Sequence, residues 1–238
     1  MSYLIVLVIV SALIFAHELG HYVAARALGI PIRRFSIGLG GKLVSFRLRT
    51  TEFRVSVFPF GGYVLPEPES FFSQTASKRM IFALGGPAAN LLCTAALLAI
   101  FNVMLHGPSV EAIFVEPIRQ TITAVGLVVG GLSHILHGSH EPLGLLGVVS
   151  QGGELVGTDF LLAIQFAVVM SINLAIINLV PIPPLDGGRV VLCLAEMAHD
   201  RAARLHIPLN IAGFVAILGL IGYTTLLDLR RVFVRLIG

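Results

Sequence analysis

Four stretches of the sequence, each about 20 residues long, are almost entirely apolar, and this length decides the class of fold. At 1.5 Å per residue, a helix of about 20 residues crosses the ~30 Å hydrocarbon core of a bilayer. In a soluble domain such helices would leave wide apolar faces in water. The sequence therefore predicts a mainly α-helical, polytopic membrane protein whose transmembrane helices cover about 3–28, 80–105, 159–180 and 207–227.

The composition agrees with this class of protein. Of the 238 residues, 56% are hydrophobic and 12% are charged, against roughly 25% charged residues in typical soluble domains. The net charge of +3 is small, and the basic residues flank the apolar stretches, which is typical of membrane orientation. We expect the whole chain, 1–238, to form one domain in the lipid bilayer, and we expect no nucleic-acid partner.

The basic residues are divided unequally between the two sides that four spans define. Twelve of the sixteen lysines and arginines lie in the connections between the first and second spans and between the third and fourth spans. By the positive-inside rule, the side that these two connections share is the cytoplasm, and both termini are then extracytoplasmic. Three arginines near the C-terminus oppose this orientation: Arg230, Arg231 and Arg235.

The connection between the second and third spans, about 107–158, is extracytoplasmic in this topology. It contains a fifth apolar stretch, about 121–136, which has three glycines and is shorter than a full span. We predict an interfacial helix here rather than a fifth transmembrane helix. Three nearby histidines could bind a second metal ion, although a solvated helix end explains them more simply: His134, His137 and His140.

The connection between the first two spans predicts a different kind of element. From about 42 to 64, apolar and polar residues nearly alternate on both sides of the polar Thr50-Thr51-Glu52. Alternation around a polar turn is typical of a β-hairpin, here amphipathic and expected at the membrane interface. Gly61-Gly62 then indicates a tight turn or a close approach of the backbone to another element.

The first span contains the motif His17-Glu18-Leu19-Gly20-His21. Residues four apart lie on the same face of a helix, so that both imidazoles can bind one Zn²⁺ ion. Glu18 lies beside them, in position to take a proton from the attacking water and return it to the leaving amine. An ionisable side chain near the centre of a span costs about 2.5–3.5 kcal/mol to insert, so a cluster of three indicates function rather than packing.

A third protein ligand is expected, because catalytic zinc usually has three. We predict Asp186, which follows the third span in the stretch Asn178-Leu-Val-Pro-Ile-Pro-Pro-Leu-Asp186-Gly187-Gly188. The prolines stop a regular helix, and such backbone at membrane depth requires a cavity or protein around it. With one intervening span, the first and third spans run parallel, so their C-terminal ends meet nearer the cytoplasm. A turn aspartate or a helix cap is the alternative explanation for Asp186.

Together these motifs resemble the site-2 protease family of intramembrane zinc metalloproteases, in particular its bacterial RseP-like branch, which cleaves membrane-bound anti-sigma proteins. The residues that carry the resemblance follow the family's order: His17 to His21, Gly61-Gly62-Tyr63, Gly86-Pro87-Ala88-Ala89-Asn90, and Asn173 to Gly187. Members of that branch usually have one or two PDZ domains between the second and third spans. The connection 107–158 is too short for one, so we expect none.

The resemblance implies the remaining assignments. His17, His21 and Asp186 would hold one Zn²⁺ per chain, and Glu18 would be the general acid and base. The hairpin would add a strand of the substrate to its edge. Residues implied to contact the substrate are Asn178, Asn173, Gly61, Gly62 and Phe58, with hydrogen bonding between helices as the alternative for the two asparagines. The substrates would be single-pass, anti-sigma-like proteins of the bacterial inner membrane.

Two other functions stay open on the sequence alone. A metal-ion transporter would also place histidine and aspartate residues within the membrane, although transporters are often built from repeats and the sequence shows none. An inactive binding protein could keep the same fold, although it would have no need of Glu18.

Overall fold

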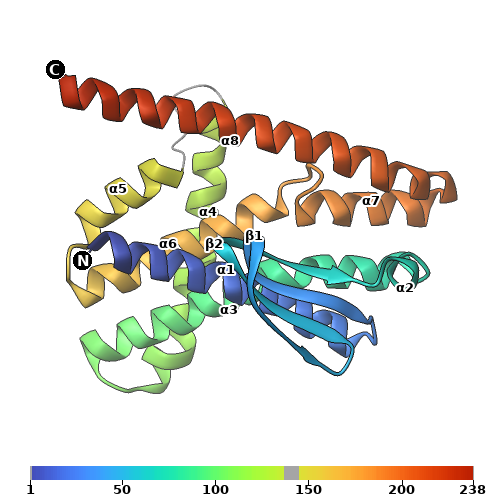
Figure 1. Cartoon of the computed structure of the whole chain (residues 1–238). Helices are drawn as coiled ribbons and strands as arrows, with labels where there is room; N and C mark the ends of the chain where they lie inside the picture. The colour runs from blue at the N-terminus through green and yellow to red at the C-terminus, as the bar shows by residue number, and fades with distance from the viewer. Residues whose placement is uncertain (1, 137–144, 238) are drawn as a thin grey trace.

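The computed structural model describes residues 2–136 and 145–237, which form helices and one small sheet (Figure 1). The helices are α1 (Ser2–Ala27), α2 (Pro68–Phe72), α3 (Ala76–His106), α4 (Glu116–Leu136), α5 (Leu145–Val156), α6 (Phe160–Leu179), α7 (Asp186–Ala198) and α8 (His206–Ile237). A π-helical turn (Glu111–Val115) precedes α4, and a 3₁₀ helix (Asp200–Leu205) precedes α8. The strands β1 (Ile32–Leu48) and β2 (Thr51–Pro66) form one sheet.

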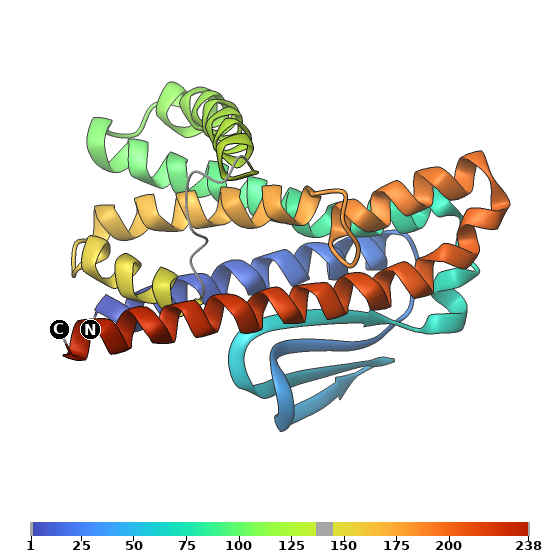
Figure 2. The same cartoon turned by 90° about the horizontal axis from the view of Figure 1, so that it is seen from above.

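The four long helices α1, α3, α6 and α8 lie along a common direction (Figure 1). α1 and α6 point one way and α3 and α8 the other, and both chain ends lie at the same end of the bundle (Figure 2). These helices coincide with the four apolar stretches of the sequence, except that α8 continues to Ile237. The up-and-down order brings the C-terminal ends of α1 and α6 to the same end of the bundle, as the pairing of the histidine motif with Asp186 requires.

The surface of the bundle is apolar enough for lipid. In the described part of the chain, five helical stretches are long and apolar enough to cross a membrane: Ser2–Ala27, Ala76–His106, Glu111–Gly130, Phe160–Leu179 and Arg201–Leu227. Large apolar side chains project outward from them, such as Leu92, which is 73% exposed. This exposure would be unfavourable in water but costs nothing in lipid. The chain is therefore a mainly α-helical, polytopic membrane protein.

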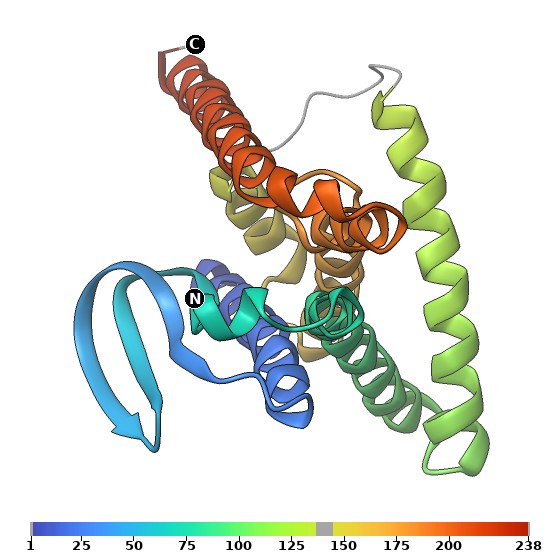
Figure 3. The same ribbon diagram turned by 90° about the vertical axis from the view of Figure 1, so that its right-hand side faces the viewer.

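The helix expected at about 121–136 is longer than the sequence analysis allowed. The helical run begins at Glu111, so a shortage of residues does not exclude a span, and that part of the prediction was wrong. However, α4 runs across α1, α3 and α6 rather than along them (Figure 3). Its residues Ala124, Val125 and Val128 pack against the buried face of α6. If α1, α3 and α6 cross the bilayer, α4 would lie near the membrane plane; its interfacial position stays a prediction.

The sheet is also longer than predicted, because β1 begins at Ile32 instead of near residue 42. Gly38 and Gly40 have φ of 84° and 89°, and they bend the strand without ending it. As a result, residues 34–37 pair with 62–65 on one side and with 52–55 on the other. In the part of the chain that the structure describes, 62–66 pair only with β1, so they form an edge of the sheet.

Aromatic contacts attach the hairpin to α1, on the side of the bundle away from α4 (Figure 3). Phe35 packs edge-on against Phe15 and Tyr22 of α1, with ring centroids 5.9 and 5.6 Å apart. Arg34 Nε donates to Glu52 Oε2 at 2.8 Å, and this hydrogen bond lowers the pKa of the Glu52 carboxyl below its ordinary value. The sheet edge formed by 62–66 is thereby held beside the helix that carries the histidine motif.

Candidate metal centre

The histidine motif of α1 meets the first residue of α7 inside the bundle. His17 Nε2 lies 3.1 Å from Asp186 Oδ2, and His21 Nε2 lies 3.2 Å from both of these atoms. All three residues are buried, with exposed fractions of 4–6%. Among the described residues, they are the one group of three or more His, Cys, Asp or Glu side chains that could hold a metal ion. The structure thus brings together the three predicted ligands.

The spacing of these atoms fits a zinc ion. With zinc–ligand bonds of about 2.0–2.1 Å, neighbouring ligand atoms of a tetrahedron are about 3.3–3.4 Å apart. The observed separations of 3.1–3.2 Å are close to this value. Two imidazoles and one carboxylate are also a donor set of catalytic zinc sites, which keep the fourth position for water or substrate.

Gly86 of α3 provides space at the ligand atoms. A methyl group at this position would lie 2.4 Å from His21 Nε2 and 2.6 Å from His17 Nε2. Both distances are far shorter than van der Waals contact and not much longer than a zinc–nitrogen bond. The glycine therefore lets both imidazoles pack directly against α3, in space that any larger side chain would occupy.

Two further glycines bring α1 and α3 together at this level. A methyl group on Gly20 of α1 would lie 2.2 Å from the carbonyl oxygen of Gly85 on α3. The two backbones are therefore in direct contact, as small residues allow in membrane helices. This contact holds the imidazoles of α1 against α3.

His21 is oriented by a backbone carbonyl. Its Nδ1 donates to Phe82 O of α3 at 2.8 Å. Because the proton is then on Nδ1, the lone pair of Nε2 is directed at the ligand cluster. The neutral tautomer that binds a metal is therefore the one that this hydrogen bond selects.

Asn90 of α3 contacts Nδ1 of His17, as Phe82 O contacts Nδ1 of His21. Its Nδ2 is 3.2 Å from His17 Nδ1, the residue is fully buried, and its Oδ1 has no partner among the described residues. When Nε2 binds a metal, Nδ1 carries the proton and needs an acceptor. A half turn of the amide brings the unpartnered Oδ1 to Nδ1, so Asn90 can supply that acceptor. Asn90 thus completes a shell of α3 groups behind both histidines.

We expect Asn90→Leu to lower the affinity for zinc by about 10–100-fold, the usual cost of losing an outer-shell partner. Competition with a zinc-binding dye, on the purified protein, measures this change. Asn102→Leu is the matched control, because Asn102 is also buried on α3 but donates to Gln120 Oε1 and lies outside the metal centre. Equal zinc affinity in Asn90→Leu and Asn102→Leu would contradict the assigned role.

The segment between α6 and α7 places Asp186. A methyl group on Gly187 would lie 2.1 Å from Leu179 O, and one on Gly188 would lie 2.3 Å from Pro183 N. Only glycine therefore allows α7 to start so close to the end of α6. Arg189 Nη1 is 3.8 Å from Asp186 Oδ1, on the side of the carboxylate that faces away from the histidines.

A cavity of about 180 Å³ opens beside the ligands. Its lining residues come from α1, β2, α3 and the α6–α7 region: His17, Glu18, His21, Gly62, Tyr63, Val64, Phe82, Asn178, Pro184, Leu185, Asp186 and Arg189. Glu18 therefore shares this cavity with the three ligands. The edge of β2 forms another wall, and a methyl group on Gly62 would lie 2.9 Å from Glu18 Cγ. The centre thus combines a metal-ligand set, a carboxylate and a strand edge.

Of the five residues predicted to contact the substrate, Gly62 and Asn178 line this cavity. Asn173 does not line it, and its Nδ2 donates to Val169 O within α6. Phe58 is 61% exposed, Gly61 packs against Leu39, and neither residue lines the cavity. Contact with the substrate stays a prediction for all five residues, and only Gly62 and Asn178 lie at this cavity. The side chains of His134, His137 and His140 lie outside the described residues.

The roles of Gly86 and Asn90 at the metal centre were not predicted from the sequence. Both residues were noted as part of a family likeness, with no function at the centre. A signal was present in the sequence: Gly86 and Asn90 are four residues apart in an apolar span, and this spacing puts them on one face of a helix. A polar amide in such a span needs a partner, which His17 supplies.

Comparison with known proteins adds an independent line of support. The profile of peptidase family M50 matches residues 5–220. A Campylobacter jejuni protein with the provisional name zinc metalloprotease is 22% identical over 345 aligned positions, covering 97% of this chain and 94% of the relative. Proteins with the same provisional name occur in Helicobacter pylori, with 30% identity over 65% of this chain and 48% of the relative, and in Chlamydia trachomatis, with 39% identity over 34% and 16%.

This chain is short beside these relatives. The alignment with the Campylobacter protein is over a hundred positions longer than the 238 residues of this chain, so that relative has segments that this chain lacks. The other two matches cover less than half of each relative's length. The family match and the names of the relatives both indicate a metalloprotease.

Proposed function

Because the chain belongs to peptidase family M50, the site-2 protease family, we propose that it is a zinc-dependent intramembrane protease that hydrolyses peptide bonds in the transmembrane segments of other proteins. One observation carries this proposal. Three buried ligand atoms, 3.1–3.2 Å apart, share a cavity with Glu18 among helices long enough to span a bilayer. A soluble metalloprotease has no use for such a setting.

His17, His21 and Asp186 would hold the zinc ion, which when bound polarises the scissile carbonyl and makes water more acidic. Glu18 takes a proton from the attacking water and gives it to the leaving amine, because it lines the same cavity as the ligands. Meanwhile the hydrogen bond from His21 to Phe82 O and the contact of Asn90 with His17 keep both imidazoles in place. Glu18 therefore transfers protons, while His17 and His21 are held in a fixed orientation.

The edge of β2 supplies a way to hold an extended substrate. A transmembrane helix must unwind before a peptide bond is cut, and the backbone groups that it frees need partners within the membrane. Residues 62–66 pair with β1 on one side, and Gly62 borders Glu18 on the other. A substrate strand added along this edge would pass Glu18 and the ligands.

We place the protein in the bacterial inner membrane, with both termini outside the cytoplasm and the metal centre nearer its cytoplasmic face. The support is the concentration of basic residues in the connections from α1 to α3 and from α6 to α8. Natural substrates would be single-pass membrane proteins of the anti-sigma kind.

Glu18→Gln tests the proposal. We expect this variant to keep one zinc per chain and to cleave about 10²–10⁴-fold more slowly, because it lacks the general acid and base. The assay uses purified protein and a synthetic single-pass substrate, a leucine–alanine helix with a central Asn-Gly pair that weakens it. Glu69→Gln, an exposed acid on α2, is the matched control and should cleave at the wild-type rate.

An undiminished rate in Glu18→Gln would reject the protease mechanism. Zinc flux into proteoliposomes, equal for wild type and Glu18→Gln, would favour the transporter instead. Zinc binding without cleavage or flux in the wild type would favour the inactive binding protein.

A further inference from the structure

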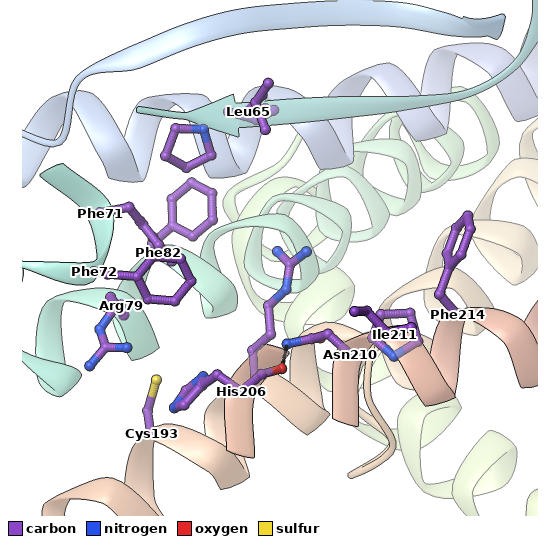
Figure 4. Close-up of a pocket in the computed structure, with 14 residues that line it drawn as sticks. Leu65, Phe71, Phe72, Arg79, Phe82, Cys193, His206, Asn210, Ile211 and Phe214 are labelled. Carbon is purple, nitrogen blue, oxygen red and sulfur yellow. Dashed lines mark hydrogen bonds between the residues drawn. The ribbon is translucent and has the colours of Figure 1, made fainter. Parts of the chain in front are cut away.

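A second and larger cavity, of about 420 Å³, adjoins the metal centre. Its walls come from β2, α2, α3, α7 and α8 (Figure 4). It shares Val64, Phe82, Pro184 and Arg189 with the cavity that holds the ligands, so the two spaces are contiguous. Its volume is in the range of about 300–1,000 Å³ that is usual for ligand pockets. The proposed hydrolysis does not use this cavity.

One part of the cavity is apolar. Phe71, Phe72 and Phe82 gather on one side, and Leu65 lies above them on the strand (Figure 4). Ile211 and Phe214 of α8 lie on the opposite side. Walls of this kind bind large apolar side chains, because an aromatic side chain buries about 150–250 Å² of surface. A small side chain would leave most of this surface without contact.

The other part of the cavity carries positive charge. Arg79 is 4% exposed and pairs with Glu196, whose second carboxylate oxygen is 3.0 Å from His206 Nε2. Arg79 Nε has no hydrogen-bond partner among the described residues. Arg189 stands where the two cavities join, and its nearest carboxylate, Asp186, is committed to the metal site. Both arginines line this cavity, whereas neither Glu196 nor Asp186 is among its lining residues.

We propose that this cavity is a specificity pocket for the substrate strand, taking a large apolar side chain close to the scissile bond and excluding a basic one. The inference rests on the proposed protease function. Residues 64–66 of β2 belong to the strand edge and also line the pocket. Alternate side chains of a strand project to the same face, so a substrate strand on this edge would direct every second side chain to the pocket. Lysine or arginine there would meet Arg79 and Arg189.

Filling the pocket from α8 tests the inference. Ile211→Trp narrows the cavity, and Leu209→Trp is the matched control because Leu209 is two residues away and does not line it. Both positions are exposed, at 60% and 40%, so a larger side chain can be accommodated without repacking a core. Zinc content equal to that of the wild type, measured for each variant, verifies an intact centre.

The synthetic single-pass substrate supplies the readout. Its scissile bond is mapped by mass spectrometry, and each residue around that bond is replaced in turn by Phe, Ala and Lys. At one position we expect wild type and Leu209→Trp to prefer Phe over Ala by at least about 10-fold in kcat/KM and to cleave the Lys substrate slowest. Ile211→Trp should lose most of the preference for Phe at that same position.

A second measurement reports binding without turnover. In a Glu18→Gln background with Cys93 and Cys193 replaced by alanine, we introduce Ile211→Cys or Leu209→Cys. A substrate with cysteine at the preferred position should form a disulfide with Ile211→Cys under mild oxidation, and not with Leu209→Cys. This arm shows whether that side chain reaches the pocket, independently of any effect on rate.

The outcomes separate this inference from the protease function. Cleavage by wild type with the same substrate preference in Ile211→Trp, or with lysine accepted at every position, overturns the pocket and leaves the protease. Crosslinking that does not distinguish Ile211→Cys from Leu209→Cys overturns it as well. An absence of cleavage by the wild type removes the proposed function and the pocket together.

Discussion

Replacing Gly86 with alanine is expected to empty the metal centre. The added methyl group would lie 2.4 Å from His21 Nε2 and 2.6 Å from His17 Nε2, so both imidazoles would have to leave their positions in the ligand cluster. If the imidazoles moved away from α3, their Nδ1 atoms would lose the contacts with Phe82 O and Asn90. We expect the zinc content of the purified variant to fall below about one tenth of an ion per chain, since a catalytic zinc site needs three protein ligands, and we expect cleavage to be lost with it.

Gly126→Ala is the matched control for this change. Gly126 also lies inside a long apolar helix, but a methyl group there meets nothing within 4 Å, so zinc content and cleavage should stay at wild-type values. Circular dichroism of both variants reports the helical content. If Gly86→Ala retained helical content and bound one zinc with wild-type affinity, the imidazoles would not need the space beside Gly86, and the packing described for them would be wrong.

The transmembrane helices could be predicted because their signal is local. Whether a stretch of residues is long and apolar enough to span lipid depends on that stretch alone, and α1, α3 and α6 begin and end close to the predicted positions. The same holds for His17 and His21, which share a helix face by spacing. Predicting Asp186 as a ligand required one more inference, that the first and third spans run in the same direction. The structure places Asp186 beside both histidines.

The two explanations of Asp186 do not exclude each other. Asp186 is the first residue of α7, where a carboxylate interacts favourably with the helix dipole, and its Oδ2 also completes the ligand cluster. A sequence pattern for a helix start and one for a metal ligand therefore coincide at this residue. Sequence alone could rank these explanations but had no means to combine them.

Contacts between helices could not be predicted, because they depend on how far each helix is rotated. Asn90 and His17 are 73 residues apart, and Phe82 and His21 are 61 apart. Their meeting follows from the close approach of Gly20 to Gly85, which fixes the rotation of α1 against α3. The early start of β1 could not be predicted either, because the alternation of apolar and polar residues was recognised only from about residue 42, whereas the strand continues through Gly38 and Gly40 at positive φ.

Asp186→Ala should cost more zinc affinity than any change behind the ligands. Removing an outer partner costs up to about 100-fold, and removing a ligand atom should exceed this. The variant leaves two imidazoles on α1 and removes the contacts that Asp186 of α7 makes with them. We therefore expect loss of both bound zinc and cleavage, measured by metal analysis of the purified protein and by cleavage of the synthetic single-pass substrate.

Asp159→Ala separates the ligand role of Asp186 from its place at a helix start. Asp159 caps α6, where its Oδ1 accepts from Leu161 N and Leu162 N, so its loss costs about 0.5–2 kcal/mol of stability through capping alone. That variant should melt at a lower temperature and still bind zinc as wild type does. If Asp186→Ala behaved in the same way, the carboxylate would serve α7 only, and α1 would have to bind the ion without α7. Loss of zinc in Asp186→Ala alone would show that one ion joins α1 to the start of α7, because the loss of a carboxylate at a helix start would affect both variants in the same way.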